Sequence, residues 1–211
     1  FLPGGLGVVT VTSCLMFGGV SGSAIADTAA IGSLVIPSML KRGYSRGFAA
    51  ALLSVAGTLA LLMPLSIPFL VYAFISGASM RQLSMAGLVP GLVMAIALIG
   101  VCVWYGRKSG CDRGDVRATR AEIWATTRDA GPALMMPLII VGGIWSGVFT
   151  PTESAAVAVV YGTLVSLFLY RDITVRDLPR LLVNAFQTSA TVMLVIGATG
   201  ALAWLITAEQ V

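Results

Sequence analysis

Histidine is absent from the 211-residue sequence, and charged residues are scarce, at 10% of the chain against about 25% in soluble domains. The absence of histidine argues against zinc and haem sites and removes the base of a rhomboid-like serine protease. The cysteines, Cys14, Cys102 and Cys111, show no CxxC or CxxH spacing, so we interpret Cys14 and Cys102 as small apolar residues. Asp27 is alone in its apolar segment, whereas an intramembrane aspartyl protease needs two carboxylates. We therefore expect no enzyme.

Apolar residues are abundant instead. They make up 57% of the chain, and the mean hydropathy is +0.95. The charges are clustered, and most of the uncharged windows between them reach the ~20 residues that cross ~30 Å of hydrocarbon. These windows lie at about 1–26, 47–80, 82–106, 130–152, 154–170 and 181–208. The sequence therefore predicts an all-α polytopic membrane protein, with the lipid bilayer as its surroundings. Because the chain starts at Phe1 and stops just after an apolar segment, we expect an internal fragment.

The net charge of +4 comes from cations in short loops between the apolar windows, so we attribute it to membrane topology and expect no nucleic-acid partner. Basic loops favour the cytoplasm. An even number of windows separates successive loops, which places the outer turns near Arg81 and near residues 150–153. The loops hold Lys41, Arg42 and Arg46; Arg107, Lys108, Arg113, Arg117, Arg120 and Arg128; and Arg171, Arg176 and Arg180.

The first window contains a Ser21-Gly22-Ser23 break, followed one helical turn later by Asp27. In hydrocarbon such a break is tolerated only where the freed backbone groups find protein, water or ion partners, which makes it a candidate binding site. We interpret 1–40 as a re-entrant hairpin that enters and leaves on the cytoplasmic side. The alternative is a full-length helix from about Val20 to Leu40.

The second window, 47–80, contains Pro64 and Pro68. Each proline removes a backbone donor and clashes with the preceding turn, so a broken helix is predicted, with a simple proline kink as the alternative. Secondary transporters bind ions and substrates at discontinuous helices, and two breaks therefore favour a transporter. A channel or a non-transporting structural subunit is the alternative function, because broken helices also line pores.

Two runs of the sequence, 21–79 and 142–207, resemble in the same order the large, DctM-type permease subunit of tripartite ATP-independent periplasmic (TRAP) transporters. The resemblance implies an elevator fold of the ion-transporter superfamily, of which this chain would hold one half and the start of a second inverted repeat. The first-repeat transport region would then be 1–106, with the hairpin at 1–40, the broken helix at 47–80 and a helix at 82–106. A cytoplasmic amphipathic connector would follow at 107–130, and the second repeat would start at 131–211.

The same resemblance implies a multi-pass permease of the bacterial inner membrane, driven by a sodium gradient and without a cofactor other than that coupling ion. Its partners would be a small DctQ-like membrane subunit and a soluble DctP-like periplasmic substrate-binding protein. The substrates would be small organic anions such as C4-dicarboxylates, other carboxylates or sugar acids.

Site residues carry over from the family by position. The implied ion-binding residues are Ser21, Gly22, Ser23, Gly57, Thr58 and Pro64, and the implied substrate or coupling residues are Asp27 and Ser66. The sodium ligands among them would be Ser21, Ser23 and Thr58. Many relatives have a second proline where this chain has Leu65, and many have threonine where it has Asp27. For Asp27 we consider a functional role, near the ion site or in binding a proton, and a structural role as a helix-capping carboxylate.

Glu153 has a structural interpretation. The segment from Thr150 to Glu153 is typical of a helix start, with Thr150 as N-cap, Pro151 at the first helical position and Glu153 completing a capping box.

Overall fold

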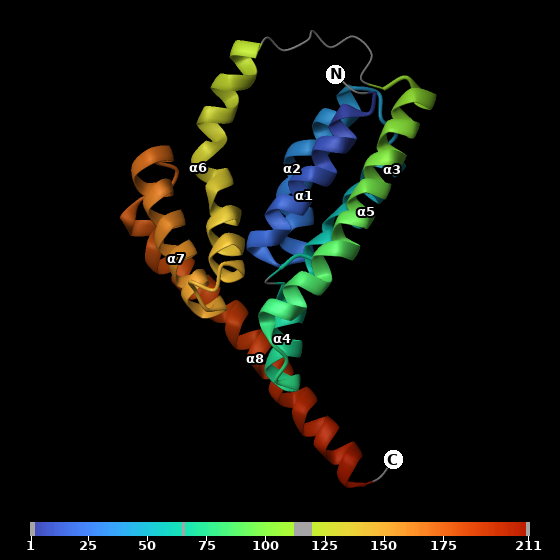
Figure 1. Cartoon of the computed structure of the whole chain (residues 1–211). Helices are drawn as coiled ribbons and strands as arrows, with labels where there is room; N and C mark the ends of the chain where they lie inside the picture. The colour runs from blue at the N-terminus through green and yellow to red at the C-terminus, as the bar shows by residue number, and fades with distance from the viewer. Residues whose placement is uncertain (1–2, 65, 112–119, 210–211) are drawn as a thin grey trace. The chain divides into compact units, whose positions relative to one another are not determined.

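The computed structural model describes residues 3–64, 66–111 and 120–209, and the regular elements in these ranges are all helices (Figure 1). The chain divides into two compact units, residues 1–159 and 160–211. The helices are α1 (Gly5–Ser21), α2 (Ala24–Lys41), α3 (Arg46–Thr58), η1 (Leu59–Leu61), α4 (Ile67–Ser76), α5 (Met80–Ser109), α6 (Arg120–Trp145), α7 (Pro151–Leu164), η2 (Val165–Tyr170), η3 (Val175–Asp177) and α8 (Leu178–Ala208).

The first two helices form the predicted hairpin. α1 ends at Ser21 and α2 starts at Ala24, so the chain breaks at Gly22 and Ser23 and the full-length helix from Val20 does not occur. Gly22 has a left-handed backbone with φ 60°, a conformation that glycine adopts without steric cost. Ser23 is the N-cap of α2 and accepts a hydrogen bond from the Ala26 N–H at 3.3 Å. Glycine and serine thus make the turn.

Both ends of the hairpin lie beside the C-terminal end of α5. We call this end of the unit the basal end. Gly7 of α1 packs against Cys102, and after α2 the Gly43 carbonyl accepts a hydrogen bond from the Cys111 thiol at 3.3 Å. The 17 residues of α1 span ~26 Å and the 30 residues of α5 span ~45 Å. The hairpin therefore starts and finishes at one end of the unit and reaches part of the way along α5 (Figure 1).

The helix predicted at 47–80 is broken, not merely kinked. α3 passes into the short 3₁₀ turn η1, and regular helix resumes only at Ile67. Pro64 lies in the break, and Pro68 occupies the first turn of α4, where the missing N–H costs no intrahelical hydrogen bond. Together, the two prolines therefore keep the first helix from continuing and set the start of the next.

α5 holds the break in place through glycines. Gly87 packs against the Phe69 ring and the Leu62 carbonyl, and Gly91 packs against Met63. A Cβ atom on Gly87 would lie 2.6 Å from the Leu62 oxygen, a distance that real Cβ atoms do not adopt. Small residues on α5 thus let the backbone of the break approach the helix closely.

α6 and α7 form a second small core in the first unit. Ile140, Ile144 and Ala158 are buried together, and the Ser154 hydroxyl donates to the Ile140 carbonyl at 3.0 Å. The start of α7 confirms the predicted capping box, because Glu153 Oε2 accepts from the Thr150 N–H at 2.8 Å and Thr150 Oγ1 accepts from the Glu153 N–H at 3.3 Å.

The connector predicted at 107–130 falls only partly on described residues. Residues 107–109 end α5, residues 120–130 begin α6, and 112–119 lie outside the described part of the chain. Trp124, one of its described side chains, is exposed.

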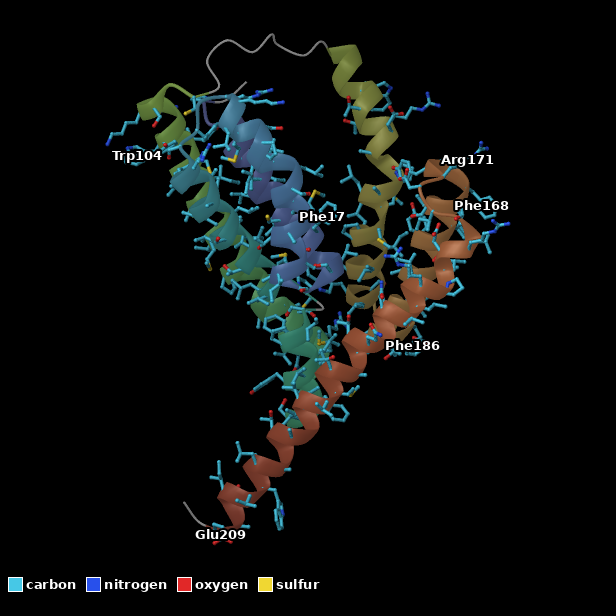
Figure 2. All side chains as sticks on the ribbon, turned by 180° about the vertical axis from the view of Figure 1, so that it is seen from behind. Phe17, Trp104, Phe168, Arg171, Phe186 and Glu209 are labelled. Atoms are coloured by element: carbon cyan, nitrogen blue, oxygen red, sulfur yellow. The ribbon has the colours of Figure 1, made fainter. Side chains whose placement is uncertain are left out.

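The second unit consists of the rest of α7, η2, η3 and α8. η2 is a π-helix that ends at Arg171, whose φ of 55° is unusual for a residue other than glycine. A capping box between Thr174 and Asp177 precedes α8, a 31-residue helix without a buried residue. Large apolar side chains such as Phe186 project from α8 (Figure 2).

Four described helical segments are long and apolar enough to cross a membrane. They are Ala24–Lys41, Met80–Ser109, Pro151–Tyr170 and Val175–Ala208. The protein is therefore an all-α, multi-pass membrane protein, as its composition predicted.

Candidate cation site at the two helix breaks

The two breaks in the first unit meet each other. The backbone N–H of Ile67, the first residue of α4, donates a hydrogen bond to the Gly22 carbonyl at 3.4 Å. The first N–H groups of a helix have no partner within that helix, so Ile67 is free to make this bond. The hairpin tip and the discontinuity after η1 thus form one structural feature.

Small residues also bring the hairpin and the broken helix into contact at two other positions. A Cβ on Gly18 would lie 2.6 Å from the Ala60 Cα, and a Cβ on Gly57 would clash with Thr28 Oγ1 and lie 3.3 Å from the Ala24 carbonyl. Gly57 therefore faces the start of α2. Its role there is close packing.

Asp27 is buried at the hairpin tip, with 2% of its surface exposed. Its Oδ1 accepts a hydrogen bond from the Ser21 hydroxyl at 2.5 Å, whereas Oδ2 has no hydrogen-bond partner among the described residues. Asp27 is also the only acidic residue in positions 1–111 of the sequence. A carboxylate at membrane depth costs ~2.5 kcal/mol or more unless it is paired or solvated. The tip therefore holds a carboxylate without a described counter-charge.

The two serines of the tip have distinct roles. Ser21 Oγ accepts from the Ser23 N–H at 3.1 Å and donates to Asp27, which fixes its orientation. Ser23, not Asp27, is the N-cap of α2, so the capping interpretation of Asp27 is wrong. Among the described residues, its carboxylate accepts a hydrogen bond from the Ser21 hydroxyl and none from a backbone amide. The carboxylate thus orders Ser21 instead of capping the start of α2.

On the broken helix, the predicted residues divide into buried and exposed ones. Pro64 is buried, and Ser66 is fully buried with no hydrogen-bond partner for its hydroxyl among the described residues. Thr58 lies on the exposed side of α3, and its hydroxyl donates to the Val55 carbonyl of its own helix at 2.7 Å. The structure therefore brings Gly22 and the start of α4 together and turns the Thr58 side chain to the surface.

Ile67 is the part of the site that the sequence prediction missed. It precedes Pro68, and a proline in the first helical turn marks the preceding N–H as one without an intrahelical acceptor. That signal was present in the sequence. Its acceptor, Gly22, is 45 positions away and could not be assigned without the fold.

A cavity of about 510 Å³ adjoins the tip within the first unit. Val20 and Ser21 line it on one side, Ile67 and Leu70 of α4 on another, and mainly apolar residues of α6 and α7 on the third. Ser21 thus links the buried carboxylate of Asp27 to an open space.

Comparison with known proteins identifies relatives along the whole sequence. The family model described as "Tripartite ATP-independent periplasmic transporter, DctM component" matches residues 1–211. The 2,3-diketo-L-gulonate TRAP transporter large permease protein YiaN of Escherichia coli is 39% identical over 208 residues, covering 99% of this chain and 49% of the relative. The C4-dicarboxylate TRAP transporter large permease protein DctM of Rhodobacter capsulatus is 38% identical over 208 residues, covering 92% and 47%.

A third relative, the isethionate TRAP transporter permease protein DctMQ of Oleidesulfovibrio alaskensis, is 39% identical over 211 residues, covering 100% of this chain and 33% of the relative. The chain thus spans about half the length of two of these relatives and a third of the other. All three are named as transporter permeases, not as enzymes, and their named substrates differ.

Proposed function

Because the chain belongs to the DctM family of TRAP transporters, we propose that it forms part of a sodium-coupled, binding-protein-dependent permease for small organic anions. The observation that carries this proposal is the hydrogen bond between the hairpin tip and the broken helix, next to a buried carboxylate without a described counter-charge. Discontinuous helices that face each other are where secondary transporters bind their ions.

In this proposal a sodium ion binds between the breaks. Its side-chain ligands are the hydroxyl oxygens of Ser21, Ser23 and Thr58, of which Thr58 would have to turn inward from the exposed side of α3 to reach the ion. Gly22 and Pro64 open the backbone so that carbonyl oxygens can contribute, and Gly57, within α3, lets the two segments approach closely enough to share the ion. The Ser21 and Thr58 hydroxyls each donate a hydrogen bond, and the Ser21 and Ser23 oxygens each accept one. A hydroxyl oxygen has two lone pairs, so each of the three keeps at least one for a cation.

Asp27 and Ser66 are proposed to couple the ion to transport. The Asp27 charge offsets that of a cation at the tip, which makes each easier to hold at membrane depth. Ser66 precedes α4 and has a buried hydroxyl without a described partner, so it can contact an ion or a substrate group at the break.

We further propose that the hairpin and the broken helix move as one body in an elevator mechanism. Contacts of Gly18 with Ala60 and of Gly57 with Thr28 pack the two segments into a single block, which favours joint movement over separation.

The proposed partners are a small DctQ-like membrane subunit and a periplasmic DctP-like binding protein, and the proposed location is the bacterial inner membrane. The name DctMQ of one relative is in keeping with the first partner. The substrate class is a small organic anion, since the named substrates of relatives include isethionate, diketogulonate and C4-dicarboxylates.

Uptake into proteoliposomes tests the proposal. The full transporter, reconstituted with its cognate binding protein, should accumulate one of a panel of carboxylates, sulfonates and sugar acids when an inward sodium gradient is applied. Uptake should stop when choline replaces sodium or when the binding protein is left out. Equal uptake under an inward potassium gradient would contradict sodium coupling, and gradient-independent equilibration would indicate a channel.

A further inference from the structure

Two basic segments 60 residues apart in sequence meet at the basal end. The Tyr105 hydroxyl donates to Ser45 Oγ at 3.0 Å, and the rings of Phe48 and Tyr105 stack with their centroids 3.6 Å apart. Tyr44 stacks beside them, with its centroid 6.1 Å from each ring. These contacts fix the loop between α2 and α3 against the last turns of α5, so the charges of both segments share one surface.

We call this surface the basal patch. It consists of four exposed cations: Lys41, Arg46, Arg107 and Lys108. The described part of these two segments contains no acidic side chain, and Asp27, the only acidic residue up to position 111, lies at the opposite end of the hairpin. These four side chains therefore give the described part of the patch a net positive charge.

Trp104 lies one helical turn from Lys108 on the same face of α5. Its side chain is 60% exposed, and Lys108 Nζ lies 5.1 Å from the centroid of its ring. Figure 2 shows Trp104 projecting outward near this end of α5. Tryptophan is enriched where membrane helices leave the hydrocarbon, and a cation over its ring is held at headgroup level.

An apolar surface continues from Trp104 along α5. Val93 and Val101 lie on the same helical face and are 61% and 46% exposed. A ligand that contacts this face from Val93 to Lys108 must have an apolar part along the helix and an anionic part at its end. A phospholipid with an anionic headgroup has that chemistry, whereas an acidic soluble protein would use only the charged part.

We infer that the basal patch binds the headgroup of an anionic phospholipid, with an acyl chain along Val93, Val101 and Trp104. This goes beyond the general preference of basic loops for the cytoplasm, because the aromatic stack and the cation over Trp104 give the surface a fixed geometry. It does not depend on sodium coupling.

Thermal unfolding of the full transporter in lipid nanodiscs tests the inference. Increasing the fraction of phosphatidylglycerol in phosphatidylcholine should raise the unfolding temperature of the wild type to a plateau. Each cation removed should weaken headgroup binding by about fivefold. In the variant Lys41→Gln/Arg107→Gln/Lys108→Gln the unfolding temperature should therefore rise little with the phosphatidylglycerol fraction and reach no plateau. The matched control, Arg171→Gln/Arg176→Gln/Arg180→Gln, removes the same charge from another loop and should behave as wild type.

A second pair of variants separates the aromatic contribution from net charge. Trp104→Leu should weaken the phosphatidylglycerol response, and Trp104→Phe should retain most of it, because a phenyl ring still accepts a cation. All of these positions are exposed, and unfolding in pure phosphatidylcholine reports whether each variant folds.

Three results would overturn the inference. They are a wild type that phosphatidylglycerol does not stabilise, equal losses in the patch variant and its control, and full stabilisation by soluble polyglutamate in pure phosphatidylcholine. The last would assign the patch to an acidic protein instead.

Discussion

The Ile67 N–H donates to the Gly22 carbonyl at 3.4 Å, which joins the turn of the hairpin to the first residue of α4 through the main chain alone. A side-chain substitution other than Ile67→Pro, which would delete the N–H, cannot remove either group directly. It can only change the backbone conformation that brings them together. The site therefore depends on backbone geometry and packing as well as on the side chains that would bind an ion.

Gly22→Ala should destabilise the full transporter. Gly22 has φ 60°, and a left-handed conformation costs a residue with a side chain about 1–2 kcal/mol. The unfolding temperature in detergent should fall. Gly19→Ala is the control, because no atom lies within 4 Å of a Cβ placed there and Gly19 is inside α1, where alanine is the better helix former. Equal stability of the two variants would contradict the described turn.

Gly57→Ala should also destabilise the protein, but its effect should be reversible by a second substitution. An added Cβ would clash with Thr28 Oγ1, and overpacking of this kind costs about 1–3 kcal/mol. Thr28→Ala removes that oxygen, which otherwise bonds only to Ala24 of its own helix in the described structure. The double variant should therefore recover part of the lost unfolding temperature.

Strict additivity of the two changes would show that Gly57 and Thr28 are not in contact. This comparison of the two single variants with the double variant needs no transport assay. It therefore tests the packing of the hairpin against the broken helix separately from the proposed function.

The hairpin, its turn and the broken helix were predictable because each has a strong local signal. Ser21-Gly22-Ser23 interrupts an apolar run, and Pro64 and Pro68 exclude a regular helix between them. The roles of individual side chains were less predictable. Asp27 stands in the first turn of a helix, where capping is common, yet Ser23 takes that role because its hydroxyl is at the N-cap position.

The partners of the tip could not be predicted from the sequence. Whether Ser66 turns inward depends on the course of the chain through η1 and the break, which no periodic pattern fixes. The stack of Phe48 on Tyr105 depends likewise on how α5 packs against α3. Both follow from contacts between segments distant in sequence.

Asp27→Asn should weaken sodium binding by about tenfold or more, because the attraction between two unit charges a few ångströms apart is lost. The amide oxygen can still accept the Ser21 hydroxyl, so the hairpin should stay folded. The sodium concentration for half-maximal uptake measures the change. Asp172→Asn alters an exposed loop carboxylate and should leave that concentration unchanged. An unaltered sodium profile in Asp27→Asn would leave this residue with only a structural role.

Ser23→Ala should lower stability and sodium affinity together. Loss of the N-cap costs about 1 kcal/mol, and one proposed sodium ligand disappears. Ser45→Ala is matched, since Ser45 caps α3 by accepting from the Phe48 N–H at 3.2 Å, far along α2 from the tip. It should lower stability and leave the sodium dependence of uptake intact.

Thr58→Ala extends the comparison to the other break. If the Thr58 hydroxyl is a sodium ligand, uptake in Thr58→Ala proteoliposomes should need more sodium, with little change in unfolding temperature, because Thr58 is exposed and bonds only within its helix. Sodium dependence identical to wild type in both Ser23→Ala and Thr58→Ala would remove these residues from the ion site.

The return of α2 to the end where α1 begins has a consequence for biogenesis. A segment whose two ends lie on the same side of the membrane does not change the orientation of any later helix. That orientation is therefore independent of whether the hairpin has inserted. The helices that follow the hairpin can be inserted first, and the hairpin can fold against them afterwards. A transporter that lacks the hairpin should thus be correctly oriented and inactive.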